Sequence, residues 1–170
     1  MIRPARPEDA RKIAEIKIAA WKFAYSEILP PHILDIDVEE ESGKWAARLH
    51  TTTNCFVSSD DRGVAGYATF GPSEVLKVPS EQQLYSLYIE PVAQRQGHGG
   101  KLVRHIAAEV QAKGHRQLIV CLFSQNHRAR EFYEKLGAEF LCDATYRVDG
   151  IDYPDEVRVW RDLGKLIGKP

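Results

Sequence analysis

The stretch QRQGHGGKL, residues 94–102, follows the apolar run LYSLYI of residues 84–89 and is the most informative part of the sequence. Three glycines lie together in it, flanked by an arginine and a lysine. Glycines at the start of a helix let a ligand approach the backbone closely, and the free N–H groups there carry partial positive charge. The pattern therefore predicts a strand, a tight turn and a helix, with a phosphate site where the helix begins.

Two familiar nucleotide-binding motifs do not fit this stretch. A P-loop needs a serine or threonine after Gly-Lys to hold magnesium, and here Leu102 follows Lys101. A dinucleotide fingerprint, GxGxxG, matches at Gly97 and Gly99, but Leu102 stands where the third glycine belongs. What remains is a QxxGxG turn with two open interpretations: a phosphate cradle, or a tight turn whose glycines serve packing alone.

Length and composition indicate an ordinary globular protein. The 170 residues are most simply one domain, 1–170, and a formal net charge of -1 argues against nucleic acid or anionic lipid as partners. No stretch approaches the ~18 apolar residues of a membrane span, and the N-terminus has no apolar targeting segment, so we expect a cytoplasmic protein without a membrane partner. Cys55, Cys121 and Cys142 form no CxxC pair, and the histidines show no HExxH spacing, so we expect neither a disulfide scaffold nor a metal site.

Helix and strand signals alternate along the chain. Pro7 suits a helix start, Asp37 and Glu40 have capping-box spacing, Gly114 suits a helix end, and Asp149-Gly150 suits a tight turn. The expected strands are 2–5, 55–59, 64–70, 84–89, 117–123 and a final pair within 138–160, and the expected helices begin near residues 7, 37, 98 and 127. This order predicts an α/β fold with three layers, in which a mixed central sheet is flanked by about four helices.

A second motif follows the glycine turn. After the apolar strand at 117–123, residues 126–140 read NHRAREFYEKLGAEF, with apolar residues at helical spacing. Together the two motifs resemble the GNAT superfamily of N-acetyltransferases, with the strong match running from Tyr85 to Phe140. The opening IRPARPEDARKIAEI and the segment AAWKFAYSEILPPHILD are also similar to the first strand and early helices of that family. The resemblance implies a GNAT-like single-domain fold and acetyl-CoA as cosubstrate.

The resemblance also implies a role for each matching residue. Backbone N–H groups of the turn would bind the pyrophosphate of coenzyme A, and the preceding strand would pair with the pantetheine arm. Asn126 would form a hydrogen bond with the same arm, and Tyr133 would lie beside the sulfur. The implied cofactor-binding residues are Leu87, Tyr88, Ile89, Arg95, Gln96, Gly97, His98, Gly99, Gly100 and Asn126. Extra positive charge near the phosphates is expected from the side chains of Arg95, His98, Lys101 and Arg104.

Acetyl transfer to an amine makes three demands. The amine must lose a proton, because an unperturbed amine of pKa ~10.4 is less than ~0.1% neutral at pH 7. The oxyanion needs a donor, which the resemblance assigns to a backbone N–H near Tyr88. Tyr133, protonated at neutral pH, is the predicted acid that gives a proton to the departing thiolate. Its alternative role is packing, since Phe132 and Tyr133 both lie on the apolar stripe of their helix.

The catalytic base departs from the family pattern. Many members carry a glutamate at the position aligned with Gln83, and glutamine cannot act as a base. Glu81 points to the same face of the strand and is the predicted catalytic base, acting directly or through water, with a solvated carboxylate as the alternative. Cys121 stands where the branch that acetylates ribosomal-protein N-termini has a glutamate, which weakens that interpretation. A cysteine nucleophile is disfavoured, because a buried cysteine is usually inert.

The acceptor pocket in such folds lies between the early helices and the last strands. Aromatic rings with a carboxylate suit an amine cation, and the candidates are Trp21, Phe23, Tyr25, Glu27, Tyr146 and Tyr153. We therefore expect an N-acetyltransferase whose acceptor is a primary amine of a small molecule or peptide: a polyamine, an aminoglycoside-like drug, an amino-acid analogue or a protein amine. The alternatives are a non-catalytic acyl-CoA sensor, which Gln83 favours, and a nucleotide-binding module. The assembly state is left open, with a homodimer as one alternative.

Overall fold

The computed structural model describes residues 1–52, 54–75 and 82–168. Seven strands form one mixed sheet in the order β1-β2-β3-β4-β5-β7-β6. They are β1 (Ile2–Pro4), β2 (Cys55–Asp60), β3 (Gly63–Pro72), β4 (Gln82–Ile89), β5 (Leu118–Phe123), β6 (Glu139–Val148) and β7 (Ile151–Trp160).

The part of the chain that the structure describes contains four long helices and two short ones. The long helices are α1 (Ala10–Tyr25), α3 (Val38–Leu49), α4 (His98–Ala112) and α5 (His127–Lys135); the short ones are α2 (Pro31–Leu34) and α6 (Leu163–Ile167), and single 3-10 turns lie at Pro7–Asp9 and Pro91–Ala93. The predicted α/β fold is confirmed, and the two short helices are additions to the predicted four. No helix within the described ranges is long and apolar enough to cross a membrane.

Several element ends follow from local chemistry. The Asp37 carboxylate accepts a hydrogen bond from the Glu40 backbone N–H at 2.8 Å, which caps the start of α3. Gly114, with φ +89°, ends α4 in the left-handed conformation that favours glycine. Asp149 and Gly150 have φ values of +51° and +76°, as a two-residue hairpin turn between β6 and β7 requires.

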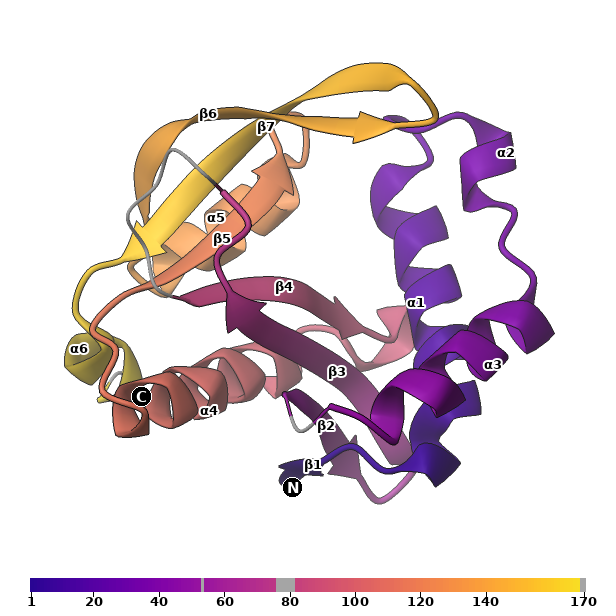
Figure 1. The fold of residues 1–170 in the computed structure, drawn as a ribbon, viewed down its shortest axis with the longest axis horizontal. Helices are drawn as coiled ribbons and strands as arrows, with labels where there is room; N and C mark the ends of the chain where they lie inside the picture. The colour runs from indigo at the N-terminus through magenta and orange to yellow at the C-terminus, as the bar shows by residue number, and fades with distance from the viewer. Residues whose placement is uncertain (53, 76–81, 169–170) are drawn as a thin grey trace. The chain divides into compact units, whose positions relative to one another are not determined.

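The chain forms two compact units, Met1–Thr69 with Ser86–Val103, and Phe70–Tyr85 with Arg104–Pro170. In the first unit α1 and α3 lie side by side (Figure 1). The core of this unit is apolar and almost fully buried, and its largest side chains are Ile13, Ile16, Trp45, Val57 and Tyr67. Burying each of these side chains contributes about 1.5–3 kcal/mol, so this core fixes the helices against β2 and β3.

In the second unit β5 has one parallel and one antiparallel neighbour. It pairs in parallel with β4 through Gln83↔Ile119 and Leu84↔Val120, and along its whole length it pairs antiparallel with β7. β7 also forms a long hairpin with β6, drawn in yellow and orange in Figure 1. Five of the six residues of β5 are buried, and the sixth, Cys121, is half-buried.

Candidate active site

The glycine turn connects β4 to α4 and belongs to the first unit. Arg95 and Gly97 have left-handed φ values of +61° and +86°. A Cβ placed on Gly97 would meet only the Lys101 Cε, at 3.8 Å, so the space above the turn is open. The first N–H groups of α4 have no acceptor inside the helix, because the first helical bond there runs from the Lys101 N–H to the Gly97 carbonyl at 3.0 Å. An open turn lined with unpaired N–H groups fits the pyrophosphate of coenzyme A.

His98, predicted as a source of positive charge near the phosphates, is buried inside the first unit. Its side chain is buried, with Nδ1 2.9 Å from the Ser58 Oγ and Nε2 3.6 Å from an Asp60 carboxylate oxygen. The imidazole therefore ties the start of α4 to β2. Arg95 and Lys101 are exposed and remain the cationic side chains of the turn.

Gln96 is fixed by hydrogen bonds on both sides of its amide. The Arg62 guanidinium donates to Gln96 Oε1 at 3.1 Å, and Gln96 Nε2 donates to the Val92 carbonyl at 3.1 Å. The Gln96 side chain therefore stabilises the turn through its hydrogen bonds with Arg62 and Val92.

The end of β4 carries the three residues predicted to pair with the pantetheine arm, and all three are half-buried: Leu87, Tyr88 and Ile89. The Tyr88 ring lies 5.7 Å from the Tyr67 ring and 6.5 Å from the Trp21 ring. Gly66 of β3 is required here, since a Cβ on it would come within 2.9 Å of the Tyr88 carbonyl oxygen. Sequence reasoning missed Gly66, although a glycine inside a strand often marks such a close backbone approach.

The predicted residues of the second unit lie on α5. Asn126 is its N-cap, and its Oδ1 accepts a hydrogen bond from the Ala129 N–H at 3.1 Å. Tyr133 is only 7% exposed and packs edge-on against Trp160 of β7, with ring centroids 5.7 Å apart. The Tyr133 ring thus belongs to the core of this unit, which supports its packing role and leaves the chemistry of its hydroxyl to be tested.

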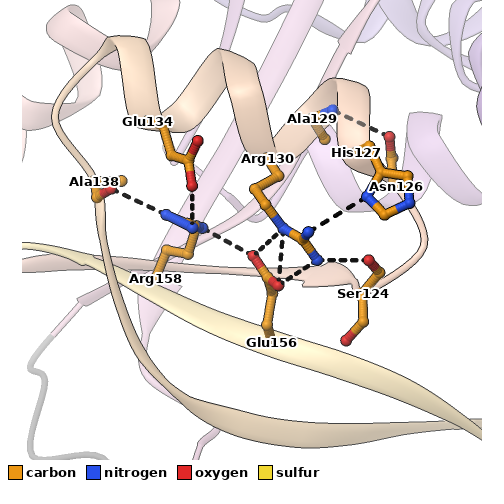
Figure 2. A network of polar contacts seen from close by, with 9 residues as sticks. All are labelled: Ser124, Asn126, His127, Ala129, Arg130, Glu134, Ala138, Glu156 and Arg158. Atoms are coloured by element: carbon orange, nitrogen blue, oxygen red, sulfur yellow. Dashed lines mark hydrogen bonds and ion pairs between the residues drawn. The ribbon is translucent and has the colours of Figure 1, made fainter.

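A buried ionic network fixes α5 to β7 (Figure 2). The Glu156 carboxylate accepts hydrogen bonds from Arg130 and Arg158 at 2.8 Å each, and Arg158 also donates to Glu134 at 2.5 Å. Arg130 donates further to the Ser124 carbonyl at 2.6 Å, which joins the end of β5 to the helix. Burial raises the pKa of Glu156, but the hydrogen bonds from both arginines outweigh that effect and leave the pKa below its ordinary value.

Glu81, the predicted base, lies outside the described residues. The nearby Gln83 is buried, and its amide is occupied: Oε1 accepts from the Glu74 N–H at 3.0 Å and Nε2 points to the Cys121 sulfur at 3.8 Å. Burial raises the pKa of the Cys121 thiol to about 12, so the thiol is protonated at neutral pH. This agrees with the expectation that Cys121 is not a nucleophile, because the thiolate is the reactive form.

The aromatic residues predicted for the acceptor pocket divide between the units. In the first unit the Trp21 and Tyr25 rings meet edge-on, with centroids 5.6 Å apart, and Phe23 is exposed. In the second unit the rings of Tyr146 and Tyr153 both pack against Phe123, at 5.4 and 6.0 Å. Phe123 was not singled out from the sequence, because an apolar residue in an apolar strand gives no signal of its own.

Comparisons with known proteins agree with this arrangement. The sequence model of the Acetyltransferase (GNAT) family matches residues 12–138. An uncharacterized N-acetyltransferase of Bacillus subtilis, YuaI, is 29% identical over 167 residues, which is 97% of this chain and 95% of that protein.

Solved structures share the fold. A GCN5-related N-acetyltransferase from Rhodopseudomonas palustris has a TM-score of 0.73 at 23% identity, covering 94% of this chain and 93% of its own. YncA of Salmonella typhimurium, a putative acetyltransferase solved with acetyl-CoA, has a TM-score of 0.69 at 20% identity, covering 100% of this chain and 95% of its own. The family match spans most of the chain and includes both the glycine turn and α5. The protein therefore belongs to the acetyltransferase (GNAT) family and is an N-acetyltransferase with acetyl-CoA as its cosubstrate.

Proposed function

We propose that the protein transfers the acetyl group of acetyl-CoA to a primary amine of a small molecule or peptide, by direct attack of the amine. The observation that carries the proposal is the open glycine turn at the start of α4, where a Cβ on Gly97 would meet only the Lys101 Cε at 3.8 Å. Such a turn presents unpaired N–H groups and partial positive charge to a diphosphate.

The residues proposed to bind acetyl-CoA lie in the glycine turn, at the end of β4 and at the start of α5. The backbone N–H groups from Arg95 to Gly100 bind the pyrophosphate, and the exposed side chains of Arg95 and Lys101 add charge. The backbone of Leu87–Ile89 pairs with the pantetheine arm. Asn126 uses Oδ1 to cap α5, so its Nδ2 is the atom proposed to donate to the same arm.

Two residues are proposed to assist the chemistry. A backbone N–H near Tyr88 stabilises the oxyanion that forms as the amine attacks. The Tyr133 hydroxyl, protonated at neutral pH, gives a proton to the departing thiolate. Glu81 stays a prediction for the base.

The direct test is thiol release from acetyl-CoA with a panel of primary amines. The proposal expects sustained release with at least one amine and no more than background release without an amine. Gln83 supports a second candidate, a sensor that binds acyl-CoA without turnover, since its amide cannot remove a proton. Tight binding of acetyl-CoA with no thiol release across the panel would favour the sensor.

The remaining proposals concern the domain organisation, the cellular location and the oligomeric state of the protein. The family match crosses from one unit to the other, which supports the two units acting as one catalytic domain over residues 1–170. Cys55, Cys121 and Cys142 are free thiols, which suits the reducing cytoplasm. A homodimer would be detected by light scattering during size-exclusion chromatography.

A further inference from the structure

Asp155 is a buried carboxylate that no part of the proposed site has used so far. It lies on β7, is 7% exposed, and pairs in register with Phe123 of β5 and Ala144 of β6. In the described part of the chain no cation forms an ion pair with it. Its carboxyl accepts a hydrogen bond from the backbone N–H of Glu156 but has no cation beside it, and a buried charge that no cation balances is costly.

The next residue on the strand shows the contrast. Glu156 is equally buried, but its carboxylate accepts hydrogen bonds from Arg130 and Arg158 (Figure 2). Side chains alternate along a strand, so Glu156 faces α5 and Asp155 faces the other side of the sheet. Glu156 is thus paired with two arginines, whereas Asp155 has no cationic partner among the described residues.

Aromatic residues lie on the same face of the sheet as Asp155. In a paired sheet, residues in register and residues two apart share a face. By that rule Asp155 shares its face with Phe123, Tyr146 and Tyr153, whose rings pack together with centroids 5.4 and 6.0 Å apart. Tyr146 is 44% exposed, so this aromatic cluster reaches solvent. A carboxylate beside aromatic rings is the combination that binds an organic ammonium.

We propose that Asp155 binds the ammonium group of the acceptor and takes up its proton, as the catalytic base of the acetyl transfer. This inference rests on the proposed function and names the substrate class of that reaction. Among the described residues of this face, Asp155 is the one buried carboxylate, and Glu74 nearby is exposed. One buried charge beside three rings suits a primary amine with a single positive charge and an aromatic or apolar substituent, and suits a polyamine poorly.

The protons balance in this scheme. One proton moves from the ammonium to the Asp155 carboxylate and then to water. The neutral nitrogen forms a bond to the acetyl carbonyl carbon, and the carbon–sulfur bond breaks. The thiolate takes the proton that Tyr133 gives, and the nitrogen loses a second proton, which restores the Tyr133 hydroxyl through solvent. The third proton stays on the amide, and the products are the N-acetyl amine and CoA.

The ionisation of Asp155 supports this role. Burial raises the pKa of the Asp155 carboxyl to about 6, the backbone N–H of Glu156 lowers it in part, and the charge of Glu156 raises it. A base with a pKa near the working pH is both ionised and basic enough to accept a proton. Among the described residues, the other ionisable groups on this face or beside it are Cys121, Cys142, Tyr146, Tyr153 and Glu74.

The test compares three substitutions in the full chain: Asp155→Asn, Glu81→Gln and Asp143→Asn. Asp143 is a matched control, because it lies on β6 in register with Glu156 and so faces the opposite side of the sheet. Thiol release is measured with phenethylamine and with spermidine, and CoA affinity is measured on the same preparations. We expect Asp155→Asn to lower kcat/KM for phenethylamine about 10²–10⁴-fold with CoA affinity unchanged, and to remove the rise of kcat/KM around pH 6. The Asp143→Asn variant should stay within about threefold of the wild type, the ordinary scatter for a residue outside the chemistry.

The following results would contradict the proposal for Asp155, in part or as a whole. If Asp155→Asn stays within about threefold of wild type, or Glu81→Gln takes the large loss instead, Asp155 is not the base. If spermidine is the better substrate, the assignment to a singly charged amine is wrong. If Asp155→Asn fails to bind CoA, Asp155→Ser is judged by the same limits. If the wild type releases no thiol with any amine, the acetyl-transfer proposal fails, and the role of Asp155 fails with it.

Discussion

Replacing Gly97 by alanine separates cofactor binding from folding, because the chain offers a matched control. Gly97 and Gly114 flank α4 with nearly the same backbone conformation, φ +86° and +89°. A Cβ on Gly114 would meet nothing within 4 Å, and one on Gly97 would meet only the Lys101 Cε at 3.8 Å. Left-handed backbone costs a non-glycine residue about 1–2 kcal/mol, so both substitutions should lower the melting temperature by about 2–8 °C.

The two substitutions should differ in coenzyme A affinity. At Gly97 the new methyl group occupies the space through which a phosphate would reach the N–H groups. Loss of one charge-assisted hydrogen bond costs about 1.5–3 kcal/mol, which corresponds to about a 10- to 100-fold higher Kd. Isothermal titration calorimetry should therefore find this loss for Gly97→Ala and wild-type affinity for Gly114→Ala. If both variants bind CoA as the wild type does, the glycine turn is not a phosphate cradle.

Three further variants test the second unit. Glu156→Ala should lower the free energy of unfolding by about 3 kcal/mol, near the low end for a broken buried ion pair, because Arg130 stays 30% exposed. Because folding lowers the pKa of Glu156, the contribution of Glu156 to the free energy of unfolding is complete above pH 4.5. That contribution is lost as the pH falls through the lowered pKa, and urea unfolding measured at a series of pH values would record the loss. Asp155→Asn should melt higher than the wild type at pH 8, because a carboxyl whose pKa rises from 3.8 to about 6 on folding destabilises the fold above that range; an unchanged or lower melting temperature would contradict this. Tyr133→Phe should reduce kcat about 10²–10⁴-fold with little change in CoA affinity, whereas near-normal kcat with a lower melting temperature would assign Tyr133 to packing.

Features that depend on a few consecutive residues could be predicted from the sequence. The Asp37 cap depends on one hydrogen bond to a residue three positions along the chain. The Asp149-Gly150 turn depends on the positive φ values that a two-residue hairpin turn requires. The glycine turn followed by α4 is also local, because strand, turn and helix are contiguous. The fold class followed from these elements and their order.

Features that depend on pairing between distant segments could not be predicted. Asp155 and Glu156 are adjacent in sequence, and a register shift of one residue would exchange which of them faces α5. The role of His98 depends on Ser58, which lies 40 residues away in the chain. The sequence shows which residues are acidic or basic, but the register of β5, β6 and β7 determines which of them have partners.

The most direct measurement is the stoichiometry of the reaction with acetyl-CoA and an acceptor amine. Free thiol and N-acetylated amine are quantified in the same reaction, by thiol titration and by mass spectrometry. Direct acetyl transfer predicts one acetylated amine for each CoA released, and release that depends on the amine. CoA release without acetylated amine would indicate hydrolysis, and binding without any release would indicate a sensor; either result would contradict amine acetylation by this protein.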